Sequence, residues 1–191
     1  TLRLSDTTDS TNIEIKAAVG AVAVSGRGSY PLLFETNGTE RMRIDSSGRV
    51  TMPYQPYANV TTPTSYSIGS GSDITIGGTW GIITNTGSHF VASSGTFTAP
   101  VAGVYQTTFA WFANATAGAR LDAYILVNNS VKFRTEQNKW ATNSSNNTAS
   151  ITASVYLNAS DYINFGVYSS VSTSTYSTAA PWGYATIHFV G

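Results

Sequence analysis

Residues that could carry out acid–base or nucleophilic chemistry are few in this sequence. The chain has no Cys, and its two histidines, His89 and His188, lie far apart. His188 alternates with Ile187 and Phe189, so we expect it to face a neighbouring subunit or solvent. A hydrolytic triad or a carboxylate pair would be hard to assemble from such groups. The sequence therefore indicates a protein that is not an enzyme.

The acids of the C-terminal part offer little for a metal ion. Asp122 and Asp161 could contribute to a Ca²⁺ site, but Ca²⁺ takes roughly six to eight oxygen ligands and no acid-rich loop is present. The alternative is that both are ordinary turn and rim carboxylates. The glycine pairs at 69–71 and 77–78 lack the Lys-Ser/Thr of a phosphate-binding loop. We therefore expect no metal and no cofactor.

Aromatic and amide side chains in the expected loops suit a sugar ligand. A sugar can place its apolar face on an aromatic ring while its hydroxyls bond to nearby amides. The candidates for receptor contact are Asn138, Lys139, Trp140, Asn143 and Tyr176. Trp140 could instead fold back over the end of the domain, and both alternatives stay open at this point.

Composition excludes two classes of partner. Only 10% of the residues are charged, the formal net charge is zero and the pI is about 6.6. Nucleic acids and anionic membranes both require clustered Lys and Arg, which are absent. No apolar run approaches the roughly 20 residues that cross a bilayer. We expect neither nucleic-acid binding nor membrane insertion.

The charges are concentrated at the N-terminal end. Residues 1–49 hold six basic and six acidic residues, which leaves four of each sign for the rest of the chain. Prolines at 53, 56 and 63 follow this charged part and forbid helix. We therefore predict a β-stalk over 1–52, a Pro-containing linker over 53–65 and a head domain over 66–191.

The stalk shows strand-like alternation in short pieces, at Leu2 to Leu4, Ile13 to Ile15, Met42 to Ile44 and Val50 to Met52. Each piece is too short to be stable alone. Three chains wrapped together would bury the alternate apolar positions on a common axis. A floppy tether is the alternative, and the regular alternation argues against it.

One stretch of the stalk resembles a known repeat. The residues from Glu40 to Val50, Glu-Arg-Met-Arg-Ile-Asp-Ser-Ser-Gly-Arg-Val, resemble a repeat found near the C-terminal end of many bacteriophage tail fibres. The Gly-Ile-Gly-Thr continuation often seen there is replaced after Val50. The resemblance implies an upstream fibre segment and a location in the virion, outside the cell.

The head reads as strands throughout. Short β-branched and aromatic runs alternate with Gly, Pro, Asn and Ser clusters, which is typical of a sandwich or jelly roll. The expected strands are Thr79 to Asn85, Phe90 to Phe97, Gly103 to Ala113, Leu121 to Val127, Val131 to Thr135, Ala149 to Leu157, Tyr162 to Tyr168 and Tyr184 to Val190. The fold class predicted is all-β, a β-stalk followed by a jelly-roll β-sandwich head.

The head also resembles the trimeric jelly roll of complement subcomponent q heads and tumour necrosis factor. Asn85, Phe90, Phe97, Gly103 and Tyr105 match that family's signature in order and spacing, while Thr79 and Thr107 stand where aromatics are usual. The turn from Leu157 to Ile163, with Ser160 in the place of Gly, and the segment Trp182-Gly183-Tyr184 add further matches. The resemblance implies a homotrimer. We assign Tyr105, Phe109, Phe165, Trp182 and Tyr184 to the core or the trimer seam.

Strand alternation predicts where the longer loops lie. Counted back from the last strand, which ends at the base in the resembled fold, the loops at 114–119, 137–147 and 169–181 all fall at the far tip. Loops on a rigid scaffold often carry binding residues. The leading hypothesis is therefore a tail-fibre tip or adhesin that binds a host glycan or protein receptor. A trimerisation and folding cap without receptor binding is the alternative, and an endoglycosidase ranks last.

Overall fold

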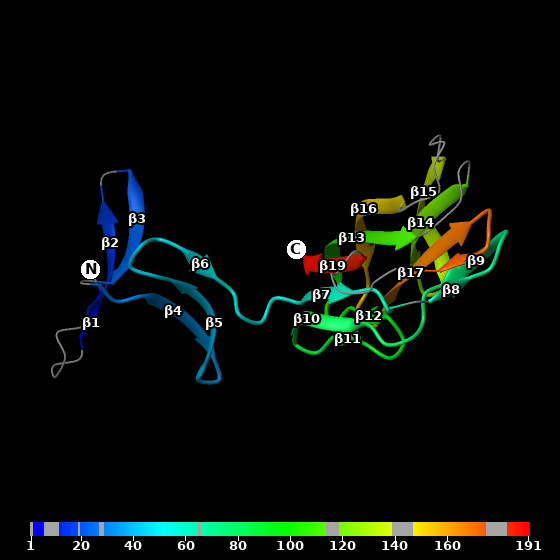
Figure 1. The fold of residues 1–191 in the computed structure, drawn as a ribbon. Helices are drawn as coiled ribbons and strands as arrows, with labels where there is room; N and C mark the ends of the chain where they lie inside the picture. The colour runs from blue at the N-terminus through cyan, green and yellow to red at the C-terminus, as the bar shows by residue number, and fades with distance from the viewer. Residues whose placement is uncertain are drawn as a thin grey trace. The chain divides into compact units, whose positions relative to one another are not determined.

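The structure is a computed structural model of the chain. It describes residues 2–5, 12–18, 20–26, 29–64, 66–113, 119–138, 147–174 and 183–191, with side chains placed at 20, 24, 29–64, 66–113, 119–136, 148–173 and 183–191. The chain divides into two compact units, Thr1–Tyr54 and Gln55–Gly191. Both are built from β-strands in the described ranges (Figure 1).

The N-terminal unit holds two antiparallel sheets of three strands each. The first has the order β1 (Leu2–Ser5), β2 (Asn12–Ala18), β3 (Ala21–Gly26), and the second the order β4 (Leu32–Thr36), β5 (Thr39–Ile44), β6 (Val50–Thr51). The four alternating segments expected from the sequence lie in or next to β1, β2, β5 and β6. Strands β3 and β4 were not predicted, although Ala21 to Val24 and Leu32 to Phe34 are β-compatible.

One face of the second sheet is apolar. Leu32, Ile44 and Val50 stand in register across its three strands, and Phe34 is opposite Met42. Residues directly opposite share a face, so these five side chains form one apolar surface. Phe34 is 45% exposed and Val50 54%, and no residue from 29 to 54 is buried. Among the described residues, this small sheet therefore lacks a buried core.

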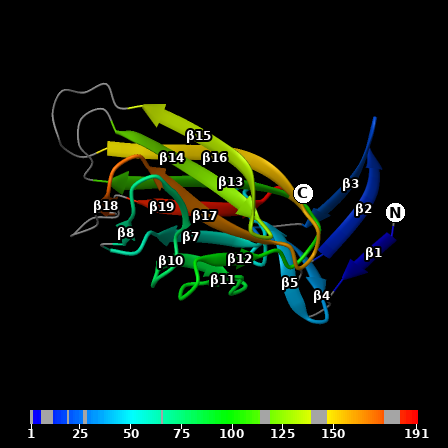
Figure 2. The same ribbon diagram turned by 90° about the vertical axis from the view of Figure 1, so that its right-hand side faces the viewer.

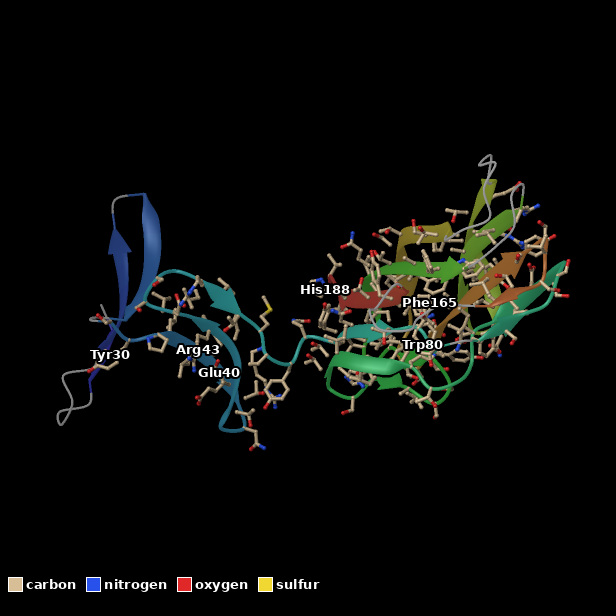
Figure 3. All side chains as sticks on the ribbon, viewed as in Figure 1. Tyr30, Glu40, Arg43, Trp80, Phe165 and His188 are labelled. Carbon is tan, nitrogen blue, oxygen red and sulfur yellow. The ribbon has the colours of Figure 1, made fainter. Side chains whose placement is uncertain are left out.

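Polar contacts fix the turns of the same sheet. Asn37 and Gly38 both have positive φ, which suits the two-residue turn between β4 and β5. Asp45 accepts hydrogen bonds from the main-chain N–H groups of Ser47 and Arg49, both at 2.9 Å. The bond from Arg49 is the main reason that the pKa of Asp45 lies below its ordinary value. Glu40 and Arg43 form a two-point ion pair (Figure 3).

The C-terminal unit is a sandwich of two antiparallel sheets. Sheet one has the order β10-β7-β19-β13-β16. Its strands are β10 (Gly81–Thr86), β7 (Tyr57–Thr61), β19 (Tyr184–Phe189), β13 (Gly103–Ala113) and β16 (Asn147–Leu157). Strand β19, near the end of the chain, is therefore the central strand of this sheet.

Sheet two has the order β11-β12-β17-β14-β15, and β9 pairs with β17 beside it. Its strands are β11 (Phe90–Val91), β12 (Thr96–Thr98), β17 (Tyr162–Ser169), β14 (Arg120–Val127), β15 (Ser130–Asn138) and β9 (Ser72–Thr75). A short ladder joins β8 (Ser67–Ile68) to β18 (Thr173–Ser174).

Aromatic residues fill the space between the sheets. Phe109 of sheet one stacks on Phe165 of sheet two with ring centroids 4.9 Å apart, and Trp80 contacts both rings (Figure 3). Burial alternates along β16 and along the first half of β13, so one side of each strand enters this core, while the last five residues of β13 are all buried. None of the described residues belongs to a helix that could cross a membrane.

The C-terminal unit begins earlier than the sequence predicts. The linker expected at 53–65 contains β7, which pairs with both β19 and β10, and the unit starts at Gln55. Pro56 and Pro63 flank β7 and do not interrupt it, while Ala58 and Val60 alternate into the core. The proline spacing predicts a linker because the two-residue alternation between the prolines is too short to indicate a strand by itself.

The other predicted strands occur within a few residues of their expected bounds, with one exception. Phe90 to Phe97 is not one strand but the two short strands β11 and β12, paired with each other through Phe90 and Phe97. The turn between them contains Gly95, whose φ is +66°. A side chain at Gly95 would collide with the buried Trp80 indole, so this turn needs glycine for close packing as well as for its backbone angle.

Two turns at one end of the sandwich also require left-handed backbone. Asn128 and Asn129, with φ of 51° and 62°, form the two-residue turn between β14 and β15. Ser160 has a φ of 75° in the turn before β17. A residue with a Cβ is strained in this conformation, and glycine is not.

Replacing Ser160 by glycine should therefore stabilise the protein. We expect the free energy of unfolding to rise by about 0.5–1 kcal/mol, because the relief of strain exceeds the added entropy of the unfolded chain. Urea unfolding of Ser160→Gly against the wild type measures this. Ser154→Gly is the matched control: Ser154 lies in β16, where glycine should cost about 0.5–1 kcal/mol. Destabilisation by both variants would contradict the strain at Ser160.

Candidate binding and assembly surfaces

The strand ends that flank the three longer segments lie at the same end of the sandwich. Ala113 pairs with Asn147 and Arg120 with Asn138, while Leu121 is opposite Ser169. We call this end the apex (Figure 2). The other end, the base, holds the β14–β15 turn and the start of β7, where Tyr57 is opposite His188. These described strand ends follow the alternation that the sequence predicts.

Most of the predicted receptor-contact residues lie outside the described residues. These are Lys139, Trp140, Asn143 and Tyr176, and Trp182 of the aromatic set joins them. The main chain of Asn138 ends β15 at the apex, opposite Arg120. Tyr105, Phe109 and Phe165 are fully buried in the core between the sheets, whereas Tyr184 is 40% exposed on the outer face of sheet one.

Hydrogen bonds tie the apical strand ends together. The main-chain N–H of Arg120 donates to the Ser170 hydroxyl (2.9 Å), and the Ser170 N–H donates to the Arg120 carbonyl (3.0 Å). The Ser70 hydroxyl donates to the Ser170 carbonyl (2.7 Å), and the Gly71 N–H to the Ser169 carbonyl (2.8 Å). The strand ends from which two of the three segments leave are therefore held rigidly.

Behind these strand ends lies a charged cluster on the outer face of sheet two. Asp122, whose side chain is fully buried, accepts two bonds from Arg120, at 2.9 and 2.7 Å, and one from Arg134 Nε at 2.7 Å. Arg134 also donates two hydrogen bonds of 2.9 Å to the Asp73 carboxylate. Glu136 lies 3.2 Å from Arg120. Both oxygens of this buried carboxylate therefore accept hydrogen bonds from guanidinium groups.

Aromatic rings complete this cluster. The guanidinium of Arg134 lies 5.2 Å from the ring centre of Tyr124 and 5.4 Å from that of Tyr168, and Arg120 lies 5.1 Å from Tyr168. The Tyr124 ring covers Gly166 on the neighbouring strand, where any side chain would collide with it. Its hydroxyl donates to the Val167 carbonyl at 2.9 Å, and burial raises the pKa of Tyr124.

Sequence reasoning missed this cluster. The alternation of Arg120, Asp122 and Tyr124 puts all three on one face, which was a usable signal. The pairing register of the β14–β15 hairpin could not be predicted, because an irregularity between Ile125 and Leu126 shifts the pairing by one residue. Only that shift sets Arg134 opposite Tyr124.

The outer face of sheet one has the opposite character. Its five strands contain no Asp, Glu, Lys or Arg, whereas Asp73, Arg120, Asp122, Lys132, Arg134 and Glu136 all lie on strands of sheet two. The face carries hydroxyls and amides together with exposed apolar side chains at its base, Val104 at 36%, Tyr156 at 64% and Val190 at 62%. We call this surface the uncharged face.

The two candidate calcium ligands are occupied by other groups. Asp122 accepts hydrogen bonds from Arg120 and Arg134. Asp161 accepts bonds from the Asn128 side chain (2.7 Å) and from the main-chain N–H (2.8 Å) and side chain of Asn158, which joins the two basal turns. These bonds, chiefly the one from Asn128, lower the pKa of Asp161. Within the described ranges no group of three or more His, Cys, Asp or Glu could hold a metal ion.

Loss of the Asp122 charge should be strongly destabilising. In Asp122→Asn a buried amide replaces the carboxylate and turns its NH2 donors toward guanidinium donors, and we expect the free energy of unfolding to fall by about 1–3 kcal/mol. Urea unfolding measures this. Glu136→Gln is the matched control, because Glu136 is exposed and its pair with Arg120 should contribute less than about 1 kcal/mol. Equal losses in both variants would contradict the role of burial.

Asp161 should make part of the stability depend on pH. Its folded-state pKa is lowered, so its contribution is complete above the unfolded value near 3.8 and is lost as pH falls through the folded value. The stability gap between wild type and Asp161→Asn should therefore be constant above about pH 5 and shrink below pH 4. Thermal unfolding from pH 7 to pH 2.5 tests this, and a gap that does not change with pH would refute it.

Comparisons with known proteins agree with this architecture. The profile of the C1q domain matches residues 73–183. Among solved structures, Eiger TNF from S. frugiperda superposes with a TM-score of 0.54 at 11% identity, covering 72% of this chain and 93% of that one. Murine APRIL superposes with a TM-score of 0.53 at 9% identity, covering 71% and 99%. No curated protein matches the sequence.

At such low identity these structures establish the fold, a C1q/TNF jelly roll, and nothing more specific. The profile match is independent of them and spans more than half of the chain, from β9 to the residue before β19. Domains of the C1q and TNF type are typically extracellular, trimeric and receptor-binding, and are generally binding or structural modules without enzymatic activity. The chain belongs to the C1q domain family.

Proposed function

We propose that this chain is the C-terminal part of a bacteriophage tail fibre or a similar adhesin, which attaches to a host cell through the apex of a trimeric head. The observation that carries the proposal is the shared apical position of the strand ends flanking 114–118, 139–146 and 175–182. The chain enters the unit at the other end, beside His188. Binding residues would therefore point away from the fibre.

The ligand we propose is a host-surface glycan, with a protein receptor as the second possibility. Residues 138–147 and 175–181 are rich in amides and hydroxyls and carry Trp140 and Tyr176, which suits stacking on a sugar ring. The rigid strand ends at Arg120 and Ser170 support such a site, because pre-organised segments lose less entropy on binding. Three copies of a weak site would gain avidity on a cell surface.

Two surfaces support a homotrimer. The uncharged face exposes the apolar side chains of Val104, Tyr156 and Val190. Its strands lack the charged side chains that normally favour the exposure of a sheet surface to solvent. The apolar face of β4, β5 and β6 is uncovered as well. Two further copies of the chain could cover both surfaces around one axis, which a closed symmetric assembly permits.

The fibre assignment rests on the Glu40 to Val50 stretch. It forms β5, the Asp45 turn and β6, so the resemblance covers a complete hairpin with its own ion pairs. We place the protein in the virion, outside the cell, with an upstream fibre segment as its structural partner. A pure trimerisation cap is the second candidate, because both uncovered surfaces serve assembly without any receptor.

Removal of the two apical aromatics separates these candidates. The full chain should form a trimer by light scattering and bind cells of its host or a glycan array. Trp140→Ala with Tyr176→Ala should reduce this binding more than tenfold while the trimer persists, as expected for lost stacking contacts of about 1.4 kcal/mol or more.

Tyr30→Ala is the matched control, since Tyr30 is an exposed tyrosine of the N-terminal unit, and its binding should equal that of the wild type. Unchanged adsorption by the double variant would favour the cap. A monomeric wild type would reject both candidates.

A further inference from the structure

His188 lies at the basal end of the uncharged face. It lies on β19, the middle strand of sheet one (Figure 3). Across the sheet it stands in one row with Thr86, Tyr57, Gln106 and Ser154, one residue from each other strand. The side chain is exposed, because Ile187 beside it takes the position that faces the core. The next outward row holds the exposed apolar residues Val190, Val104 and Tyr156, so a copy that covers this row also lies against His188.

Among the described residues, no charged side chain of the five strands accompanies the imidazole on this face. From β7 it meets the Tyr57 ring edge-on, with centroids 5.9 Å apart and an interplanar angle of 88°. The other titratable side chains facing the same way are Tyr184 on β19 and Tyr156 on β16. The described outward residues of β13 and β10 are not titratable, and no strand of this sheet has an Asp, Glu, Lys or Arg.

We infer that His188 makes the trimer seam acid-labile, so that acidification weakens or opens the head assembly. The inference rests on the proposed trimer and adds that pH regulates its stability. Histidine is the side chain that changes charge between about pH 5 and 8. A neutral imidazole can be buried against a second copy, whereas an imidazolium buried without a carboxylate partner is strongly disfavoured.

The direction of the effect follows from proton linkage. An imidazolium is solvated in the separated subunits and desolvated in the covered seam, so the association constant should fall as the pH is lowered. A trimer contains three copies of the site. In the limit of complete exclusion the association constant drops by up to about a thousandfold per pH unit, one factor of ten for each imidazole.

The sequence provides a matched pair of variants. His188→Gln removes the titrating group from the seam and keeps a polar side chain of similar reach. His89→Gln makes the same change in the turn between β10 and β11, where the ring is half-buried beside Phe97. Because the pKa values of Asp45 and Asp161 are lowered, both carboxylates stay ionised at pH 5.

Sedimentation velocity of the full chain at pH 7.5 and pH 5.0, at equal ionic strength, tests the inference, with circular dichroism to follow the fold. We expect wild type and His89→Gln to be trimers at pH 7.5 and to dissociate at least tenfold more readily at pH 5.0. His188→Gln should remain a trimer at both pH values.

Equal acid dissociation in His188→Gln would overturn the inference, as would a wild-type trimer whose dissociation constant does not change with pH. Both of those results leave the proposed trimer intact. A wild type that is monomeric at pH 7.5 would instead reject the trimer of the proposed function, and the acid switch with it.

Discussion

The stack of Phe109 on Phe165 is the contact on which the C-terminal unit depends. One ring comes from β13 of sheet one and the other from β17 of sheet two, and Trp80 packs against both. Each such aromatic pair contributes about 0.5–1.5 kcal/mol beyond the area that it buries. Because side chains alternate along a strand, fixing these rings inward also fixes which residues of β13 and β17 point outward.

The two outer faces that result are chemically unlike. Sheet two carries the charges of the unit's strands, and it compensates them internally around the buried Asp122. Sheet one has none, so its surface relies on hydroxyls, amides and a few exposed apolar side chains. A protein that remained a monomer would gain little from this separation. For a chain that assembles through sheet one, the separation avoids the desolvation of charges in the interface.

The N-terminal unit has a related requirement. Its second sheet places five apolar residues on one face, and nothing in the described chain covers them. Its turns, by contrast, rest on local features that need no other chain, the positive φ of Asn37 and Gly38 and the hydrogen bonds to Asp45. Local hydrogen bonds therefore shape the hairpins, while their stability as a sheet depends on an apolar partner surface.

The sequence by itself determined the class of the fold and the principal strands. Two-residue alternation is strong in β16 and β19, β-branched and aromatic residues are frequent in β13 and β14, and Gly, Asn and Ser clusters mark the strand ends. It also indicated that the strand ends flanking the long segments share one end of the sandwich, because antiparallel connections must alternate between the two ends. It did not reveal β7, where a short alternation stands between prolines and is stabilised only by pairing with β19 and β10.

Only the tertiary structure decided which residues meet across strands. The shift between Ile125 and Leu126 brings Arg134 to Tyr124 and Asp122, and no local signal marks it, because its benefit comes from a distant contact with Asp73. Likewise, the lack of charge in five separate segments became a surface only when pairing joined them around β19. The lack of charged residues in each strand can be read from the sequence, but the uncharged surface forms only when the strands are ordered in a sheet.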